Sequence, residues 1–352
     1  MAWRERVSSP SARSPDTTRM FQEAAEGPAV VDRMLRANRD AVAALGENLR
    51  AHPPRAVVTL GRGSSDHAAT YAKYLIETGA GVLTASGAPS ISSVYEARQA
   101  LADVLILAVS QSGRSPDLLS AVEAARNAGA RVVALVNDAD SPMAGLAHVV
   151  LPLHAGPETS VAATKSYIAA LSAVAQLTAA WTEDRDLSAA LDRLPDQLAQ
   201  AWTLDWSPAV QALTPAKSLF VLGRGPGFAA AQEAALKLKE TCGLHAEAFS
   251  AAEVLHGPMA LVEARFPVLI FAQGDLSETG VVGLARDLAA RQAQVLLAGA
   301  DEPGALPFAR AHAALQPIAL IQSFYRMANA LSLARGFDPD SPPHLRKVTE
   351  TV

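Results

Sequence analysis

The sequence has little cysteine, few aromatic side chains and no strong excess of charge of one sign. Its single cysteine, Cys242, cannot form an internal disulfide or a cysteine-rich zinc site. The 30 basic and 35 acidic residues give a net charge of -5, which disfavours a nucleic-acid backbone as the main partner. We therefore expect a protein of a reducing compartment, the cytoplasm, that does not bind nucleic acid.

Long apolar runs are also missing. The most apolar segments are 104–109 and the alanine-rich 168–181, and the second contains Ser172, Gln176 and Thr178. A membrane-spanning helix needs about 20 consecutive apolar residues, so we expect no membrane span. The first twenty residues lack the apolar core of a secretory signal, and we interpret them as a loose tail.

The chain contains an internal duplication. Three apolar runs recur in the same order, namely 55–63 as 217–225, 104–106 as 268–270, and 132–135 as 295–298. The offset is 217 minus 55, or 162, for the first run, and it changes by at most two for the others. A repeat of this length indicates two copies of one domain.

Each copy alternates short apolar runs with longer segments of helical spacing. In the first copy the predicted strands lie near 56–60, 81–85, 104–109, 132–136 and 148–152, and the predicted helices lie near 66–78, 116–128 and 160–181. This alternation predicts an α/β fold in which two tandem domains each hold a parallel, doubly wound, flavodoxin-like sheet flanked by helices.

Further helices are predicted near 17–50 and 187–203, ahead of the two copies. The predicted organisation is a tail and leading helix over 1–50, a first domain over 51–203 and a second domain over 204–352. Pro208 and Pro215 mark the boundary zone.

Two polar loops of the first copy follow predicted strands and open predicted helices. The first contains Gly61, Gly63, Ser64 and Ser65, and free amides at a helix start favour an anion. A dinucleotide fingerprint would need a third glycine at Asp66, and no GxxxxGK[ST] sequence occurs, so we expect neither NAD nor a Walker-type nucleotide site.

The second loop brings Ser110, Gln111, Ser112 and Ser115 together within six residues. Hydroxyls and amides at neighbouring strand ends can surround a phosphate without a metal ion. Such residues also cap helices, but the presence of both loops in one copy favours phosphate binding. The second copy has Gln273 to Leu276 at this place and lacks the hydroxyl cluster.

The polar residues of the second copy gather elsewhere. Glu233, Lys237 and Glu240 share one face of a predicted helix, and their spacing alone favours a solvated salt-bridge face over a catalytic one. His256 precedes a Gly-Pro pair on an irregular segment that can present a functional side chain. Lys347 provides an amine that can close over a site or form a Schiff base. No HExxH pattern occurs, and we expect no metal and no cofactor.

Together these stretches resemble the SIS (sugar isomerase) family, and in particular the isomerase half of glucosamine-6-phosphate synthases, from about residue 30 to the end. The matching stretches are 63–65 with 67–69, 110–113, 155–158 with 161–165, 235–240, 245–248, 256–258 and 342–349. The resemblance implies a small sugar phosphate as the partner and a homodimer with shared active sites.

The resemblance also implies roles for single residues. It places the sugar phosphate on Ser65, Ser110, Gln111, Ser112 and Ser115, with Ser64 in the same loop, and the sugar against the backbone at Val161. Glu240 would move a proton between C1 and C2 while Lys237 helps to set its charge. His256 would assist ring opening in a neighbouring subunit, and Lys347 would close over the sugar and form a transient imine.

Several residues depart from the synthase pattern. Arg62, Asp66 and Arg114 replace a cysteine, an aromatic residue and an acid, and Lys347 is followed by Val-Thr-Glu. The chain begins without the glutaminase domain of the synthases, so we expect that ammonia does not come from glutamine. These departures resemble stand-alone SIS-type deaminases, which implies conversion of glucosamine 6-phosphate to fructose 6-phosphate and ammonia.

Other functions stay open. A deglycase acting on phosphorylated fructosamines or a synthase-like isomerase without a glutaminase would use the same bases. A galactosamine or tagatose phosphate substrate is also open. A non-catalytic sugar-phosphate sensor is the alternative from another class, but Glu240, His256 and Lys347 favour an enzyme.

Overall fold

The computed structural model describes residues 13–347, and the chain forms two compact units. Within the described residues, the first unit comprises 27–158 and 165–196, and the second comprises 13–26, 159–164 and 197–347. The domain limits expected from the sequence, 51–203 and 204–352, stay predictions. Residues 1–12 of the expected loose tail, and the residues after Lys347, lie outside the described chain. The expectation of a loose tail is wrong for residues 15–20, because Pro15–Thr17 and Arg19–Ala25 are helical and Met20 is buried.

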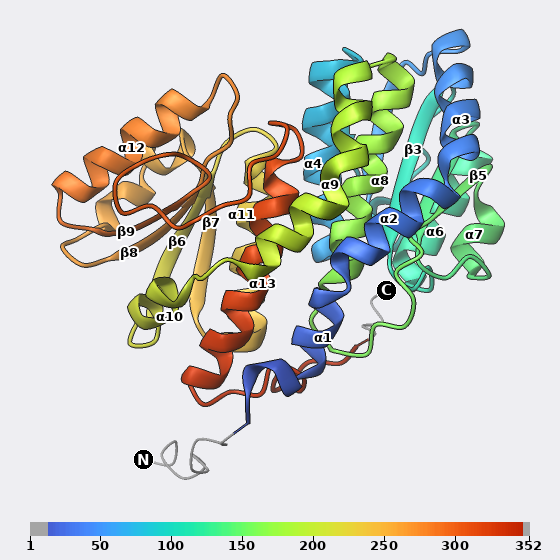
Figure 1. Ribbon diagram of the computed structural model, residues 1–352. Helices are drawn as coiled ribbons and strands as arrows, with labels where there is room; N and C mark the ends of the chain where they lie inside the picture. Colours follow the sequence, from blue (N-terminus) through green and yellow to red (C-terminus); the bar gives the residue numbers. More distant parts are fainter. Residues whose placement is uncertain (1–12, 348–352) are drawn as a thin grey trace. The chain divides into compact units, whose positions relative to one another are not determined.

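A parallel sheet forms the centre of the first unit (Figure 1). Its described strands are β1 (Ala56–Leu60), β2 (Thr84–Ser86), β3 (Val104–Ser110), β4 (Arg131–Val136) and β5 (Val149–Pro152), in the spatial order β2-β1-β3-β4-β5. All residues of β3 are buried, as expected for a central strand of a parallel sheet that is covered on both faces.

Helices cover both faces of this sheet. They are α2 (Gly27–Ala37), α3 (Arg39–Ala51), α4 (Ser64–Gly79), α5 (Ser90–Ser93), α6 (Pro116–Asn127), α7 (Pro142–Leu146) and α8 (Lys165–Thr182). Ile106 and Ala108 of β3 pack in one core with Leu118 and Val122 of α6. The helix α4 contacts β1 and β3 and packs in turn against α8. Because side chains alternate along a strand, β3 contributes to both cores.

The second unit repeats this topology with strands β6 (Ser218–Gly223), β7 (His245–Ser250), β8 (Pro267–Phe271) and β9 (Gln294–Ala298), in the order β7-β6-β8-β9. Its other elements are η1 (Pro15–Thr17), α1 (Arg19–Ala25), α10 (Ser207–Leu213), α11 (Gly227–Cys242), η2 (Glu253–Leu255), η3 (Pro258–Leu261), α12 (Glu278–Ala290) and α13 (Gln316–Ala334). The helix α9 (Arg185–Thr203) begins in the first unit and ends in the second. The predicted α/β fold and its duplication are confirmed.

Three element boundaries differ from the sequence prediction. The helix expected over 17–50 is broken into α1, α2 and α3. The first break lies before Pro28, which lacks the amide hydrogen that a continuous helix needs and is accepted in the first turn of α2, and the second break lies at Asn38. The strand expected over 81–85 begins at Thr84.

No helix within residues 13–347 combines the length and the apolar character needed to cross a bilayer.

The helix expected over 160–181 begins only at Lys165. A carboxylate from far along the chain holds the residues before it, because Glu23 Oε1 accepts hydrogen bonds from Thr159 N at 2.5 Å and from Thr159 Oγ1 at 2.9 Å. Glu23 Oε2 also accepts a bond from Ser160 N at 3.1 Å. The amides of Thr159 and Ser160 therefore donate to Glu23, and these residues precede the helix instead of forming part of it.

The helices α11 and α13 pack against each other in the second unit, and Cys242 is buried between them. The Cys242 Sγ atom lies 3.4 Å from the carbonyl oxygen of Ala328. Burial raises the pKa of the Cys242 thiol to about 11.

We expect Cys242 to resist thiol reagents in the native protein. A thiol with this pKa is roughly 0.1% thiolate at about pH 8, and the thiolate is the reactive form. Titration with a chromogenic disulfide should show no reaction until denaturant is added, and then one thiol per chain. Rapid stoichiometric labelling of the folded protein would contradict this burial.

Candidate active site

The predicted phosphate loops leave the first sheet at one point. The strands β1 and β3 are parallel neighbours, and Leu60 lies beside Ala108 in their register. The strand β2 lies on the other side of β1, so the chain crosses over in opposite directions after β1 and after β3. Ligands of open α/β sheets bind at the carboxyl ends of strands where the order reverses in this way. We call the loops 61–65 and 111–115 at this place the phosphate edge.

The hydroxyl groups of the phosphate edge are mostly not used as helix caps. Ser115 directly precedes α6 but makes no side-chain capping bond, and Gly63, which precedes α4, has no side chain to make one. Ser110 is buried and its Oγ accepts a hydrogen bond from Gly113 N at 3.0 Å, while Ser112 Oγ accepts one from Arg114 N at 3.3 Å. These contacts fix the loop and leave the capping interpretation without support at Ser115.

Gly113 allows the second loop to fold tightly. Its φ of +63° lies in the left-handed region that favours glycine, and a Cβ atom there would collide with the Ser141 side chain. The Gly113 carbonyl accepts a hydrogen bond from Met143 N at 3.2 Å, so the loop is attached to the start of α7. The backbone of the phosphate edge is therefore held in place before any ligand arrives.

An ion pair links the first loop of the phosphate edge to the start of α6, the helix that follows the second loop. Arg62 donates from Nε and Nη2 to Asp117 Oδ2, at 2.8 and 2.6 Å. The Asp117 side chain is fully buried at the start of α6, whereas half of the Arg62 side chain is exposed. The sequence marks Arg62 only as a departure from the synthase pattern and does not predict its pairing with Asp117, although an acidic residue just after Pro116 is a signal for a helix start.

At the equivalent edge of the second sheet, the side chain of Gln273 occupies the space between the loops. Gln273 Nε2 donates to the Arg224 carbonyl at 3.0 Å and to Asp275 Oδ2 at 2.7 Å. A Cβ atom on Gly227 would collide with Gln273 Oε1, so the glycine is needed for this approach. The duplicated edges therefore differ in chemistry, as the sequence predicts.

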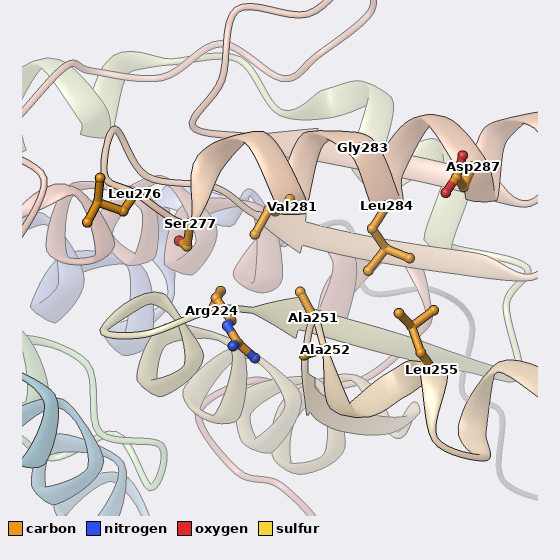
Figure 2. A pocket seen from close by; sticks show the side chains of 11 residues that line it. Arg224, Ala251, Ala252, Leu255, Leu276, Ser277, Val281, Gly283, Leu284 and Asp287 are labelled. Carbon is orange, nitrogen blue, oxygen red and sulfur yellow. The ribbon is translucent and has the colours of Figure 1, made fainter.

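A pocket of about 450 Å³ lies near this filled edge (Figure 2). Its apolar walls come from α12 and from the chain after β7, and Figure 2 shows Val281 and Leu284 across from Ala251, Ala252 and Leu255. The lining contains Arg224 and Asp287 but no cluster of hydroxyl groups like that of the phosphate edge.

The charged residues of α11 form a buried cluster. Lys237 Nζ lies 2.5 Å from Glu240 Oε2 and 3.5 Å from Glu233 Oε1. Side-chain exposure is 0% for Glu233, 1% for Lys237 and 20% for Glu240. The interpretation as a solvated face is therefore wrong for Glu233 and Lys237. Helix α11 packs on α13 and on the sheet, which removes this face from water.

Tyr325 of α13 completes this cluster. Its hydroxyl donates a hydrogen bond to Glu233 Oε1 at 3.0 Å, and its side chain is fully buried. Tyr325 is not predicted from the sequence, because no local pattern indicates that a residue 92 positions away faces Glu233. A lone tyrosine in an apolar helix looks like any other core residue.

The remaining predicted site residues are His256, Val161 and Lys347. His256 is exposed between η2 and Gly257, and within residues 13–347 no hydrogen bond or ion pair joins it to Glu240. Val161 is half-buried in the segment 159–164, and Lys347 is half-buried as the last described residue. In the part of the chain that the structure describes, no group of three His, Cys, Asp or Glu side chains could hold a metal ion. The roles of His256, Val161 and Lys347 stay predictions.

We expect the Arg62→Ala variant to bind inorganic phosphate about tenfold more weakly than the wild type. Removal of Arg62 leaves the buried Asp117 carboxylate without this partner and releases the first loop from α6. A loss of ~1.4 kcal/mol in binding free energy corresponds to a tenfold loss of affinity. Isothermal titration calorimetry measures the dissociation constant.

Arg114→Ala is the matched control for this variant. Arg114 lies in the second loop, but its partner Asp138, at 2.8 Å, is exposed. Exposed ion pairs contribute little, so the affinity should change less than about threefold. Equal losses in the two variants would show that the buried pair has no special part in fixing the loops.

Comparison with known proteins identifies the family. The model of the SIS domain matches residues 52–180 and 212–304, one match in each copy of the duplication. A glutamine–fructose-6-phosphate aminotransferase (isomerizing) from Aeropyrum pernix is 37% identical over 322 residues, which cover 84% of this chain and 51% of that protein. The chain thus spans about half the length of the curated relatives it matches.

Two solved structures have the same fold. A protein from Silicibacter pomeroyi DSS-3 whose name assigns it as a phosphosugar isomerase is 47% identical, with a TM-score of 0.88 over 92% of this chain and 100% of that one. A glucosamine-6-phosphate deaminase from Thermotoga maritima is 20% identical, with a TM-score of 0.77 over 95% of this chain and 100% of that one. The chain, with its two parallel sheets and its two matched segments, belongs to the SIS domain family.

Proposed function

We propose that the chain is an amino-sugar phosphate deaminase that converts glucosamine 6-phosphate and water to fructose 6-phosphate and ammonia. The observation that carries the proposal is the Lys237–Glu240 pair of α11, in which a buried ammonium holds a carboxylate that is still partly exposed. One such base can serve two adjacent carbon atoms, which is the requirement for an aldose-ketose isomerisation.

The phosphate edge is assigned the sugar phosphate. Its ligands in this proposal are Ser64, Ser65, Ser110, Gln111, Ser112 and Ser115, with the backbone amides of both loops. Support comes from the position of these loops where the strand order reverses between β1 and β3, and from the Ser115 hydroxyl, which makes no capping bond to α6. Arg62 adds a positive charge beside the loops while Asp117 holds it in place.

The proton steps are assigned to residues of the second unit and of the neighbouring subunit. His256 opens the sugar ring, Glu240 removes the proton from C2 of the aldehyde form, and the same carboxylic acid returns a proton to C1. The product is an imine at C2, and the addition of water followed by loss of ammonia gives fructose 6-phosphate. In this proposal Lys347 closes over the sugar, and the backbone at Val161 touches it.

A second candidate function is the reverse direction of the same chemistry. The 37% identity to an isomerizing aminotransferase favours the synthesis of glucosamine 6-phosphate from fructose 6-phosphate and ammonia. The arginines at 62 and 114 favour the deaminase instead, because they depart from the synthase pattern.

We also propose a cytoplasmic homodimer in which His256 serves the neighbouring chain. Sedimentation that shows a fully active monomer would contradict the shared site.

We expect purified protein to release ammonia and fructose 6-phosphate in equal amounts from glucosamine 6-phosphate. Coupled assays for the two products, run side by side, measure the ratio. Turnover of phosphorylated fructosamines in place of glucosamine 6-phosphate would move the assignment to a deglycase. Binding without turnover of either sugar would indicate a sensor.

The Glu240→Gln variant should lose at least about 100-fold in kcat and keep its affinity for the sugar phosphate, because general acid-base catalysis is worth about 10² to 10⁴ in rate. Glu263→Gln is the control, since this carboxylate is exposed in the same unit. Unchanged turnover in Glu240→Gln would exclude the assigned base.

A further inference from the structure

Tyr325 connects α13 to the charged cluster of α11. Its hydroxyl lies 3.0 Å from Glu233 Oε1, Glu233 lies 3.5 Å from Lys237 Nζ, and Lys237 lies 2.5 Å from Glu240 Oε2. The side chains of Tyr325, Glu233 and Lys237 are buried, and the side chain of Glu240 is partly exposed. A continuous line of polar contacts therefore runs from the core of the second unit to the proposed base.

The cluster contains two carboxyl groups and one ammonium group. A buried carboxylate keeps its charge only where a counter-charge and hydrogen bonds replace the lost water. The Tyr325 hydroxyl supplies such a hydrogen bond to Glu233. Glu233 can then remain charged and compete with Glu240 for the single ammonium group of Lys237.

We propose that Tyr325 is a positioning residue for the proton transfer at Glu240. By holding Glu233 as a carboxylate, it divides the charge of Lys237 between Glu233 and Glu240. Glu240 is thereby left with less than a full counter-charge when it takes a proton from carbon. This inference rests on the proposed function, because it takes Glu240 as the base. Tyr325 acts through Glu233 and Lys237.

Loss of the hydroxyl has a definite consequence in this arrangement. In Tyr325→Phe, Glu233 loses a donor, so burial favours its protonated form, and the Lys237 ammonium then faces one carboxylate fewer beside Glu240. In Glu233→Gln the competing charge is removed directly, and the same final state results. The two substitutions should therefore lower the rate to the same extent, and their combination should add nothing.

The experiment is a double-mutant cycle on kcat and KM with Tyr325→Phe, Glu233→Gln and the double variant of the full chain. We expect each single variant to lower kcat about tenfold, in keeping with the loss of a hydrogen bond to a charged group. The double variant should match Glu233→Gln. KM should stay within about twofold, since the phosphate edge is unchanged.

Ser323→Ala is the matched control. Ser323 lies on the same helix, is buried, and donates its hydroxyl to the Ala201 carbonyl at 2.8 Å, outside the charged cluster. It should lower the melting temperature as much as Tyr325→Phe does but leave kcat within about twofold. Additive losses in the cycle, or an unchanged kcat in a folded Tyr325→Phe variant, would overturn the proposal.

The same variants should be compared for exchange of the sugar C1 and C2 hydrogens with deuterium oxide, observed by proton NMR. A wild type that exchanges these hydrogens but releases no ammonia would refute the deaminase and still test Tyr325, through the exchange rates. A wild type that releases ammonia while the cycle is additive refutes only the role of Tyr325. A wild type that does neither overturns both.

Discussion

Parallel pairing of the strands is the constraint on which the rest of this protein depends. Every strand pair found within residues 13–347 is parallel, so each connection crosses back over the sheet and the loops that follow the strands gather at one edge. This brings the loop after β1 to the loop after β3, although about 50 residues separate them. The Arg62–Asp117 ion pair then joins the loop after β1 to the start of α6, two segments that the sheet topology places side by side.

The two copies use one topology for different chemistry. In the first, the edge at the β1/β3 reversal offers hydroxyl groups and amides on loops fixed by Gly113 and Ser110. In the second, Gln273 occupies the corresponding place, and the polar groups lie inside α11 instead. Burying Lys237 is unfavourable unless its charge is matched, and replacing such pairs with apolar residues often leaves stability unchanged or improves it. Stability alone therefore does not account for this cluster, in keeping with the proton transfer that we propose for Glu240.

The sequence predicts those features that depend on local patterns. Apolar runs predict the strands, because a buried parallel strand such as β3 must be apolar on both faces, and the three-residue spacing correctly places Lys237 beside Glu240. Spacing does not tell which side of α11 is covered, so the burial of Glu233 and Lys237 was not predicted. Tyr325, Asp117 and Glu23 were missed for one reason: each acts on a group that only the folded chain brings near. The delayed start of α8 at Lys165 has the same origin.

We propose that the two duplicated edges have different roles and that the first one holds the phosphate. A crystal structure with bound fructose 6-phosphate tests this most directly. We expect the phosphate group on the loops 61–65 and 111–115, within hydrogen-bond distance of Ser65, Ser110 and Ser112. A phosphate group found beside Arg224 and Gln273, or in the pocket under α12, would contradict the account.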